Sequence, residues 1–204
     1  MSQPVVIFDL GKVLVDFDYT IAARKIAARS TKAPQDLHAF LGNSPLLMEY
    51  ESGRLTRLEF FEAVRKAIGY QDDLTKFGCY FADIFSEIPG TIALHAELRR
   101  RGFKTYIFSN TNDLAIEHVR RRFPFFSKFD GYIFSCEVGA MKPETAIYKA
   151  MENMCGRCGA DLIYLDDRAE NIAAGAARGW RTIQHHSADA TRKEFETIGI
   201  LPVG

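Results

Sequence analysis

One short stretch near the N-terminus decides the fold: VVIFDLG, at residues 5–11. Its first four residues are apolar, mostly β-branched, and the run stops abruptly at Asp9. A run that is apolar at every position is typical of a strand buried on both faces in a parallel sheet. The stretch therefore predicts a buried parallel strand that is followed directly by Asp9.

Similar apolar runs recur in the second half of the chain, at residues 103–108, 132–134, 162–165 and 182–183. Helical patterns lie around and between them, at residues 91–101, 113–123, 145–154 and 168–178. Alternation of strand and helix is the pattern of a parallel sheet covered by helices on both faces. The predicted fold class is therefore α/β, with a Rossmann-like core.

The segment between residues 18 and 88 differs, because it contains helical patterns only. These patterns fall at residues 21–28, 36–41, 46–50, 58–68 and 74–85. Thr56 and Glu59 form a capping-box motif before the fourth of them. A segment of ~70 residues is too long for one crossover between strands. We therefore expect a helical cap at residues 18–88, inserted after the first strand of a core formed by residues 1–17 and 89–204.

The composition excludes several classes of protein. The 204-residue chain is 47% apolar, which is enough to bury a core. Its 26 basic and 26 acidic residues cancel, so nucleic acid is not an expected partner. No apolar run approaches the ~20 residues that a membrane span needs. The first residues lack the charged and apolar stretches of a signal peptide, and we expect a cytoplasmic protein.

Cys155 and Cys158 form a C-x-x-C motif, a pattern that occurs in zinc and redox sites. A zinc site of this kind usually has a second ligand pair at similar spacing, and no such pair follows here. We interpret the motif as part of a loop between a helix and a strand. The five scattered histidines are interpreted as surface or packing residues.

Polar residues follow four of the predicted strands closely. In chain order they are Asp9, Ser109, Asn110, Lys142, Asp166 and Asp167. Because the carboxyl ends of the strands line the ligand crevice of an open parallel sheet, we expect these residues to converge.

These residue types suit phosphoryl transfer. A carboxylate can attack phosphorus and form an acyl phosphate. Neighbouring carboxylates can hold magnesium, which neutralises charge between the nucleophile and the phosphate. A lysine, a hydroxyl and an amide can bind the remaining phosphate oxygens. The order of these residues, each shortly after a strand, supports this interpretation more than any single residue does.

Four motifs in this order resemble those of the haloacid dehalogenase-like hydrolase superfamily. They are FDLGKVL at residues 8–14, FSNT at 108–111, KPE at 142–144 and LDD-x3-N at 165–171. Within the superfamily the chain resembles the bacterial glucose-1-phosphate phosphatase group, also in YE-x-G at residues 50–53. The resemblance implies a magnesium-dependent phosphomonoester hydrolase. Its substrate would be a small phosphate ester, such as a sugar phosphate, and its intermediate a phospho-aspartate.

The resemblance also implies the nucleophile and the metal ligands. Asp9 would be the nucleophile and a magnesium ligand. The main-chain carbonyl of Gly11 would be a second ligand and Asp167 a third, with Asp166 close by.

The same resemblance implies which groups hold the substrate. Ser109 and Asn110 would bind phosphate, and Lys142 would neutralise charge on the nucleophile and the phosphate. Cap residues 46–54, which include Tyr50, would face the crevice and select the ester.

The chain departs from the superfamily just after the nucleophile. The usual phosphatase pattern has a second aspartate two residues on, acting as general acid and base, where this chain has Gly11. The next residue is commonly glycine, and here it is Lys12, which we interpret as solvated. Without an acid at position 11, esters with weakly basic leaving groups should react best. That expectation favours sugar 1-phosphates over sugar 6-phosphates.

Two alternatives stay open. A 2-haloacid dehalogenase of the same superfamily also begins with aspartate attack and needs neither a second acid nor magnesium. However, those enzymes usually carry an aromatic residue at the position of Gly11, and the Asp166–Asp167 pair favours a metal. The second alternative is a non-catalytic binding protein on the same fold, against which the intact Asp9 and Lys142 argue.

Overall fold

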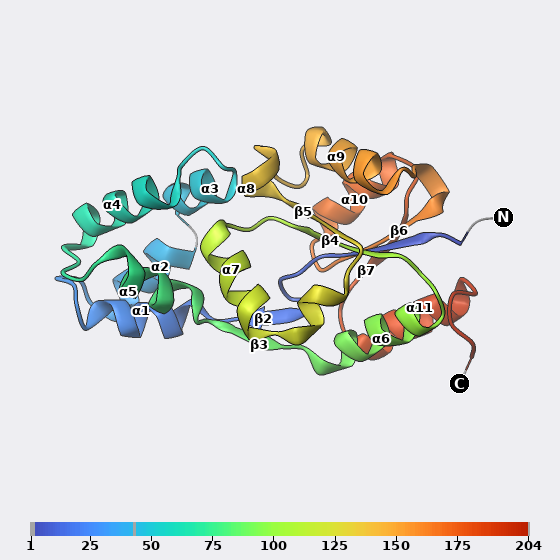
Figure 1. Ribbon diagram of the computed structural model, residues 1–204, viewed down its shortest axis with the longest axis horizontal. Helices are drawn as coiled ribbons and strands as arrows, with labels where there is room; N and C mark the ends of the chain where they lie inside the picture. The colour runs from blue at the N-terminus through green and yellow to red at the C-terminus, as the bar shows by residue number, and fades with distance from the viewer. Residues whose placement is uncertain (1–2, 43, 204) are drawn as a thin grey trace.

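The computed structural model describes residues 3–42 and 44–203, so residues 1, 2 and 204 of the expected core and residue 43 of the expected cap lie outside the described residues. Its centre is a five-stranded parallel sheet in the order β5-β4-β1-β6-β7 (Figure 1). The strands are β1 (Val5–Phe8), β4 (Thr105–Ser109), β5 (Gly131–Phe134), β6 (Leu162–Asp166) and β7 (Arg181–Gln184). The predicted α/β class is confirmed, and β1 occupies the middle of the sheet.

Helices cover both faces of this sheet, because alternate residues of a strand point to opposite faces. Helices α9 and α10 lie on one side of the sheet, and α6 and α11 lie on the other (Figure 1). Val6 and Phe8 of β1 pack with α6, α7 and α11, whereas Ile7 and Phe108 pack with α9 and α10. These helices are α6 (Pro89–Arg100), α7 (Asp113–Arg122), α9 (Thr145–Cys155), α10 (Ala169–Ala177) and α11 (Ala188–Thr197). The short helix α8 (Ser135–Val138) and two 3-10 helices (Pro124–Lys128 and Gly159–Asp161) complete this part.

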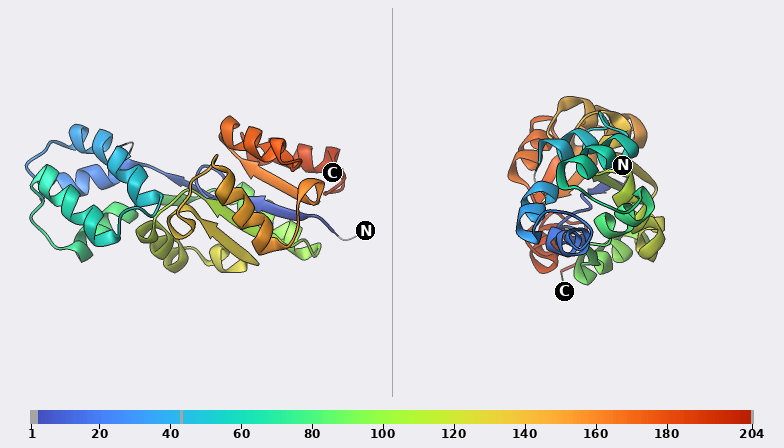
Figure 2. Two further views of the ribbon diagram at one scale, coloured as in Figure 1. Left: turned by 90° about the horizontal axis from the view of Figure 1, so that it is seen from above. Right: turned by 90° about the vertical axis from the view of Figure 1, so that its left-hand side faces the viewer.

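A second apolar core lies at the other end of the elongated molecule (Figure 2). It is built by five helices, which we call the cap. They are α1 (Tyr19–Ala27), α2 (Pro34–Gly42), α3 (Pro45–Glu51), α4 (Arg57–Ile68) and α5 (Leu74–Ala82). Aromatic rings dominate this core: the ring centroids of Phe60 and Phe81 are 5.3 Å apart, and those of Phe77 and Phe81 are 5.6 Å apart. The cap therefore has a hydrophobic interior of its own.

Two short antiparallel strands join the cap to the sheet. Strand β2 (Val15–Phe17) pairs with β3 (Phe85–Glu87), and Phe17 lies opposite Phe85. The expectation of helices alone up to residue 88 was therefore wrong at its end, because α5 stops at Ala82. The two connecting segments lie side by side, and pairing satisfies their main-chain groups.

Helix α4 begins as its capping-box motif predicts. The Thr56 hydroxyl accepts a hydrogen bond from the Glu59 main-chain N–H at 3.3 Å, and the Glu59 carboxylate accepts one from the Thr56 N–H at 2.8 Å. Two of the N–H groups that a helix start leaves unpaired are thereby satisfied.

The C-x-x-C motif lies at the C-terminal end of α9. Cys155 ends α9, Cys158 is exposed in the loop that follows, and both thiols are free. Neither belongs to a group of potential metal ligands within the described ranges.

Across the same ranges, no helix combines the length and the apolar character that crossing a membrane requires.

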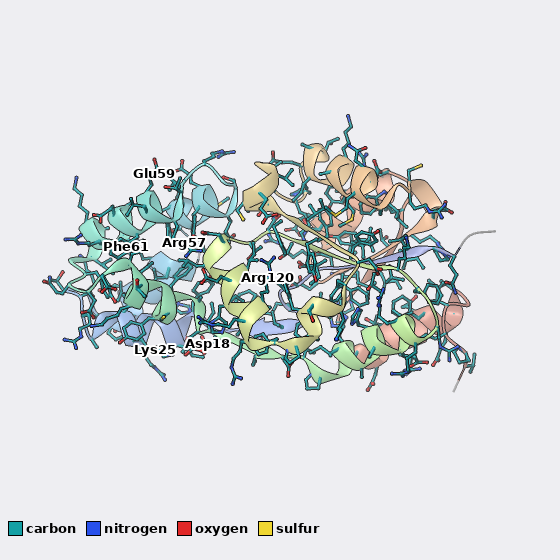
Figure 3. All side chains as sticks on the ribbon, viewed as in Figure 1. Asp18, Lys25, Arg57, Glu59, Phe61 and Arg120 are labelled. Carbon is teal, nitrogen blue, oxygen red and sulfur yellow. The ribbon has the colours of Figure 1, made fainter. Side chains whose placement is uncertain are left out.

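One contact between cap and core centres on Asp113, the first residue of α7. Its carboxylate accepts a hydrogen bond from the Tyr50 hydroxyl and one from Arg57 Nε at 2.7 Å. Arg57 also donates to Glu117 at 2.9 Å, and Figure 3 shows it on the side of the cap that faces the core. A helix N-terminus is a favourable place for a carboxylate, so α7 supports this anchor electrostatically.

A second contact holds the end of α3 against the core. The Ser135 hydroxyl donates to the main-chain carbonyl of Glu51 at 2.5 Å. Gly53, with φ of 73°, lies so close to the carbonyl oxygen of Cys136 that a Cβ atom would overlap it. Only glycine fits this left-handed position without a shift of the segment around Gly53 relative to the segment around Cys136.

We predict that Gly53→Ala destabilises the protein more than Gly139→Ala does. Gly139 has a similar φ of 77° but nothing within 4 Å of an added Cβ, so its substitution carries only the left-handed backbone penalty of about 1 kcal/mol. Gly53→Ala adds the overlap with Cys136 and should cost about 1–3 kcal/mol more. Thermal unfolding of both variants measures the difference. Equal melting temperatures of the two variants would contradict this prediction, because they would show that the contact between position 53 and Cys136 can adjust without a loss of stability.

Candidate active site

A cavity of about 570 Å³ lies between the carboxyl edge of the sheet and the cap. Both parts of the molecule contribute to its walls. The core supplies Asp9, Gly11, Lys12, Ser109, Asn110, Asn112, Lys142, Asp167 and Arg168, and the cap supplies Tyr19, Ser44, Leu47, Met48 and Glu51, among others. Of the predicted catalytic, phosphate-binding and metal-binding residues, only Asp166 is absent from the lining, and it is buried in contact with Lys142. The convergence predicted from the strand ends is therefore observed.

Lys142 is the most heavily engaged of these residues. Its ammonium is 2.9 Å from Asp9 Oδ1 and 2.6 Å from Asp166 Oδ2, and it donates to the main-chain carbonyl of Phe108 at 2.9 Å. Burial lowers the pKa of this ammonium, but the two carboxylates outweigh burial and the pKa is raised. Lys142 is therefore charged in the folded protein, although only 5% of the residue is exposed.

Asp9 follows β1 directly and is 8% exposed. Its Oδ1 accepts the main-chain N–H of Leu10 at 2.7 Å in addition to its contact with Lys142. Burial raises the pKa of Asp9 to about 7, with a further rise from Asp166 and an opposing effect of Lys142. The folded protein therefore disfavours the carboxylate form of Asp9, and a further cation beside it, in addition to Lys142, would stabilise that form.

Asp166 is fully buried and is satisfied by donors on both oxygens. Oδ2 accepts from Lys142 and from the Tyr164 hydroxyl, and Oδ1 accepts from the Arg168 N–H at 2.8 Å. The Asn171 amide donates to both oxygens, at 3.0 and 3.1 Å. Burial alone would raise the pKa of Asp166, but Lys142 and these donors hold it below its usual range.

Asp167 differs from its neighbour, because it is half-buried and lines the cavity. Burial, followed by the charge of Asp166, raises the pKa of Asp167. Asp9, Asp166 and Asp167 each offer a carboxylate oxygen within 4.8 Å of the others. This set of hard oxygen donors fits a magnesium ion, and Asp167 is the member whose side chain is least committed to the protein.

Ser109 ends β4 and Asn110 follows it. Both residues line the same cavity, but their side chains have different surroundings. The Asn110 amide donates to the Lys142 carbonyl at 2.9 Å, and its oxygen accepts the Lys142 N–H at 2.7 Å. The side chain of Asn110 therefore fixes the main chain of Lys142. Ser109 is 3% exposed and lines the cavity, and its hydroxyl donates to the Asn110 carbonyl at 3.4 Å.

The Phe17 ring packs against the residues that follow Asp9. A Cβ atom on Gly11 would meet the Phe17 ring at 3.0 Å, so that ring occupies the space where a side chain would start. Lys12 adopts a left-handed φ of 58°, forms an ion pair with Asp16, and lies 4.5 Å from the centre of the Phe17 ring. Lys12 is exposed, as predicted, but its charge is balanced locally.

The cap residues expected to select the substrate divide into two faces of α3. Leu47, Met48 and Glu51 line the cavity, as predicted for this segment. Tyr50 does not: it is 2% exposed, and its ring stacks on Phe60 with 4.3 Å between centroids. Positions 47, 48 and 51 share a helical face, which leaves position 50 pointing into the cap.

Two residues that the motifs did not assign a role hold Asp166 in place. Tyr164 precedes Asp166 by two positions, so strand alternation places both side chains on one face of β6. Asn171 was visible in the fourth motif, and its amide contacts both oxygens of Asp166. The period of two along the strand was the signal that could have singled out Tyr164.

Comparison with known proteins decides the family. The chain matches the haloacid dehalogenase-like hydrolase family over residues 4–179. This chain is a haloacid dehalogenase-like hydrolase. The resemblance of its four motifs to that superfamily is thereby confirmed, and membership in a family of hydrolases sets the non-catalytic alternative aside.

Individual relatives of this hydrolase are distant. The sesquiterpene phosphatase astK of Aspergillus oryzae is 24% identical over 199 residues, covering 94% of each chain. The drimenol cyclase drtB of Aspergillus calidoustus is 23% identical over 209 residues, covering 94% of this chain but only 36% of the cyclase. A HAD family enzyme of Bacteroides thetaiotaomicron, solved in complex with magnesium and inorganic phosphate, has a TM-score of 0.79 at 23% identity, over 91% of this chain and 96% of that one. These similarities support the shared fold.

The raised pKa of Asp9 generates a prediction about stability without metal. Because its folded pKa of about 7 exceeds its ordinary value of 3.8, Asp9 favours the folded state below about pH 4, and this contribution is lost as the pH rises to 7. In Asp9→Asn the side chain stays uncharged at every pH, so this loss of stability does not occur. In EDTA, we expect the variant to melt several degrees above the wild type at pH 8, with the difference shrinking toward pH 5.

Thermal unfolding of both proteins across this pH range measures the effect. Subtracting one curve from the other removes the contributions of titrating groups that do not interact with Asp9. A wild type that is more stable than Asp9→Asn at pH 8 in EDTA would mean that the ion pair with Lys142 outweighs burial of Asp9.

Proposed function

We propose that this hydrolase cleaves phosphate monoesters through a phospho-aspartate formed on Asp9. One observation carries the proposal: the buried ammonium of Lys142 lies 2.9 Å from Asp9 and 2.6 Å from Asp166, at the edge of the sheet where the cavity opens. A carboxylate nucleophile with a fixed cation beside it suits attack on a charged phosphate.

The chemistry follows from these groups. A carboxylate oxygen of Asp9 attacks phosphorus, forms the acyl phosphate and expels the ester oxygen. Lys142 stabilises the charge on the phosphoryl oxygens without reorganising, since its neighbours already hold it. The Ser109 hydroxyl and the main-chain N–H of Asn110 are the proposed phosphate donors, because the Asn110 amide is occupied by Lys142. Water then attacks the acyl phosphate, which releases phosphate and regenerates Asp9.

Charge balance supports magnesium as the cofactor. Three carboxylates (Asp9, Asp166 and Asp167) and one ammonium (Lys142) leave a formal charge of −2, which a divalent cation cancels. We propose Asp9, Asp167 and the carbonyl of Gly11 as ligands. Asp166, whose oxygens are already satisfied, orients Lys142 beside them. Bound magnesium neutralises charge between the nucleophile and the phosphate.

We propose a sugar phosphate, such as glucose 1-phosphate, as the substrate. The cavity of about 570 Å³ has the size of a small-molecule site. Ser44, Glu51 and Asn112 on its walls offer hydrogen bonds to sugar hydroxyls. Leu47 and Met48 add apolar surface, so an apolar ester of the kind named for the sesquiterpene phosphatase relative is the competing possibility.

We predict that Asp9→Asn abolishes hydrolysis of both p-nitrophenyl phosphate and glucose 1-phosphate in the presence of magnesium. An amide cannot attack phosphorus at a useful rate, and it removes a charged ligand. Phosphate release is the measurement, and circular dichroism shows that the variant is folded. Asp161→Asn, at an exposed aspartate outside the cavity, is the matched control and should retain full activity.

Residual activity of more than a few per cent in folded Asp9→Asn would remove Asp9 as the nucleophile. A screen of sugar phosphates against long-chain alkyl phosphates tests the substrate class separately. Faster turnover of the apolar esters would leave the phosphatase mechanism intact and overturn the sugar phosphate.

Magnesium is predicted to raise both activity and melting temperature. A cation that binds the folded state alone stabilises it by mass action, and here it also relieves repulsion among the carboxylates. Asp167→Asn should weaken the stabilisation. Calorimetric titration and thermal unfolding measure it, with EDTA-treated protein as the reference. Unchanged phosphatase activity in excess EDTA would exclude the metal, and EDTA-resistant turnover of a 2-haloacid would support the dehalogenase alternative.

A further inference from the structure

The proposed phosphatase reaction leaves one proton unaccounted for. When Asp9 attacks, the ester oxygen departs with an electron pair, and a basic leaving group needs a proton. The residue two positions after the nucleophile cannot supply it, because Gly11 has no side chain and the Phe17 ring fills the adjoining space. Any protein donor must therefore come from another wall of the cavity.

Most of the titratable side chains that line the cavity are unsuited to this task. Lys142 is enclosed between Asp9 and Asp166, and Lys12 is paired with Asp16. Arg168 is paired with Glu170, and a guanidinium does not give up its proton in a protein. Asp167 belongs to the carboxylate cluster assigned to the metal. Two groups from the cap are left, Tyr19 and Glu51.

Glu51 is the better placed of the two, because the core fixes its position. It is the last residue of α3, and its carbonyl accepts the 2.5 Å hydrogen bond from Ser135. The same Ser135 hydroxyl accepts the main-chain N–H of Thr111 at 2.9 Å. Thr111 follows Ser109 and Asn110, so one buried hydroxyl links the segment that carries Glu51 to the proposed phosphate-binding loop.

The direction in which the ester oxygen departs from phosphorus also favours Glu51. In phosphoryl transfer the attacking and leaving oxygens lie roughly in line on opposite sides of phosphorus. Asp9 attacks from the edge of the sheet, so the leaving oxygen lies on the side of the cap. Glu51 lines the cavity from that side.

The electrostatic surroundings of Glu51 suit a proton donor near neutral pH. Burial raises the pKa of its carboxyl to about 7, although a hydrogen bond with the Asn112 side chain opposes the rise. The titratable groups near it are Tyr19 on α1 and Cys136 on α8. Burial raises the pKa of both, that of Cys136 to about 12, so both are neutral at pH 7. Tyr19 consequently holds its proton too tightly to serve as the acid.

We propose that the carboxyl group of Glu51, presented by the cap and clamped to the core through Ser135, is the general acid that protonates the leaving oxygen. This proposal rests on the phosphatase function of Asp9. It assigns to the cap the acid that position 11 lacks.

The proton is returned within each cycle. As Asp9 bonds to phosphorus and the phosphorus–ester oxygen bond breaks, the departing oxygen takes the proton of Glu51 and leaves as an alcohol. The Glu51 carboxylate then accepts a proton from the water that attacks the acyl phosphate. The bond between phosphorus and Asp9 breaks, phosphate departs, and both carboxyl groups return to their starting states.

The test is a leaving-group series measured as kcat/KM, which reports the steps up to transfer to Asp9. For Glu51→Gln we expect a loss of about 100-fold or more on esters with basic leaving groups, such as alkyl phosphates and sugar 6-phosphates. The rate with p-nitrophenyl phosphate should change little, because p-nitrophenolate needs no proton. Glu51→Asp should restore part of the loss. Glu49→Gln, at an exposed glutamate of the same helix outside the cavity, is the matched control and should behave as wild type.

A pH profile provides the second readout. With an alkyl phosphate, wild-type kcat/KM should fall as the pH rises past about 7, because the acid must be protonated, and this fall should be absent in Glu51→Gln. Equal losses on p-nitrophenyl and alkyl phosphates would overturn the proposal, as would a raised KM with an unchanged pH profile, which marks a residue that only binds the sugar. If the wild type hydrolyses no phosphate ester, the phosphatase function itself fails.

Discussion

The buried ammonium of Lys142 is the interaction on which the rest of the site depends. A charge removed from water is tolerated only when opposite charges and hydrogen bonds replace the lost hydration. Here those partners are Asp9, Asp166 and the carbonyl of Phe108. They belong to β1, β6 and β4 or follow them directly, and Lys142 itself lies in the loop after α8. One cation thus ties together three strand ends of the same sheet edge.

The core and the cap contribute different groups to the site around Lys142. The core holds a preorganised group of charges that is nearly independent of the cap, since the partners of Lys142 and Asp166 come from the core alone. The cap closes the cavity and adds the groups that meet the variable part of a substrate. Ser135 and Asp113 are where the two parts are held in register. A site of this kind can change its substrate through α3 while the phosphate-binding edge stays the same.

Sequence patterns predicted the sheet and the site well where a local signal existed. Each strand end was marked by an apolar run that stopped at a polar residue, so the pattern alone placed Asp9, Ser109 and Asp166 together. Strand β3 was missed because three residues are too few to show an alternation. Tyr50 was misplaced because its expected position rested on the resemblance alone, which does not show which side of the seven-residue helix α3 faces the cavity. The Asn110 side chain was expected to bind phosphate but bonds the main chain of Lys142 instead. Only the folded chain brings these two residues together, so no sequence pattern indicated this contact.

The central place of β1 has a consequence for how the chain is made. Its residues pair with β4, which ends at Ser109, and with β6, which ends at Asp166. Synthesis proceeds from the N-terminus, so β1 leaves the ribosome before either of its neighbours, which both lie in the second half of the chain. An apolar segment with both edges unpaired is an aggregation hazard until its neighbours emerge. The cap, whose own aromatic core is complete by residue 85, emerges in the interval and can fold while β1 waits for its partners.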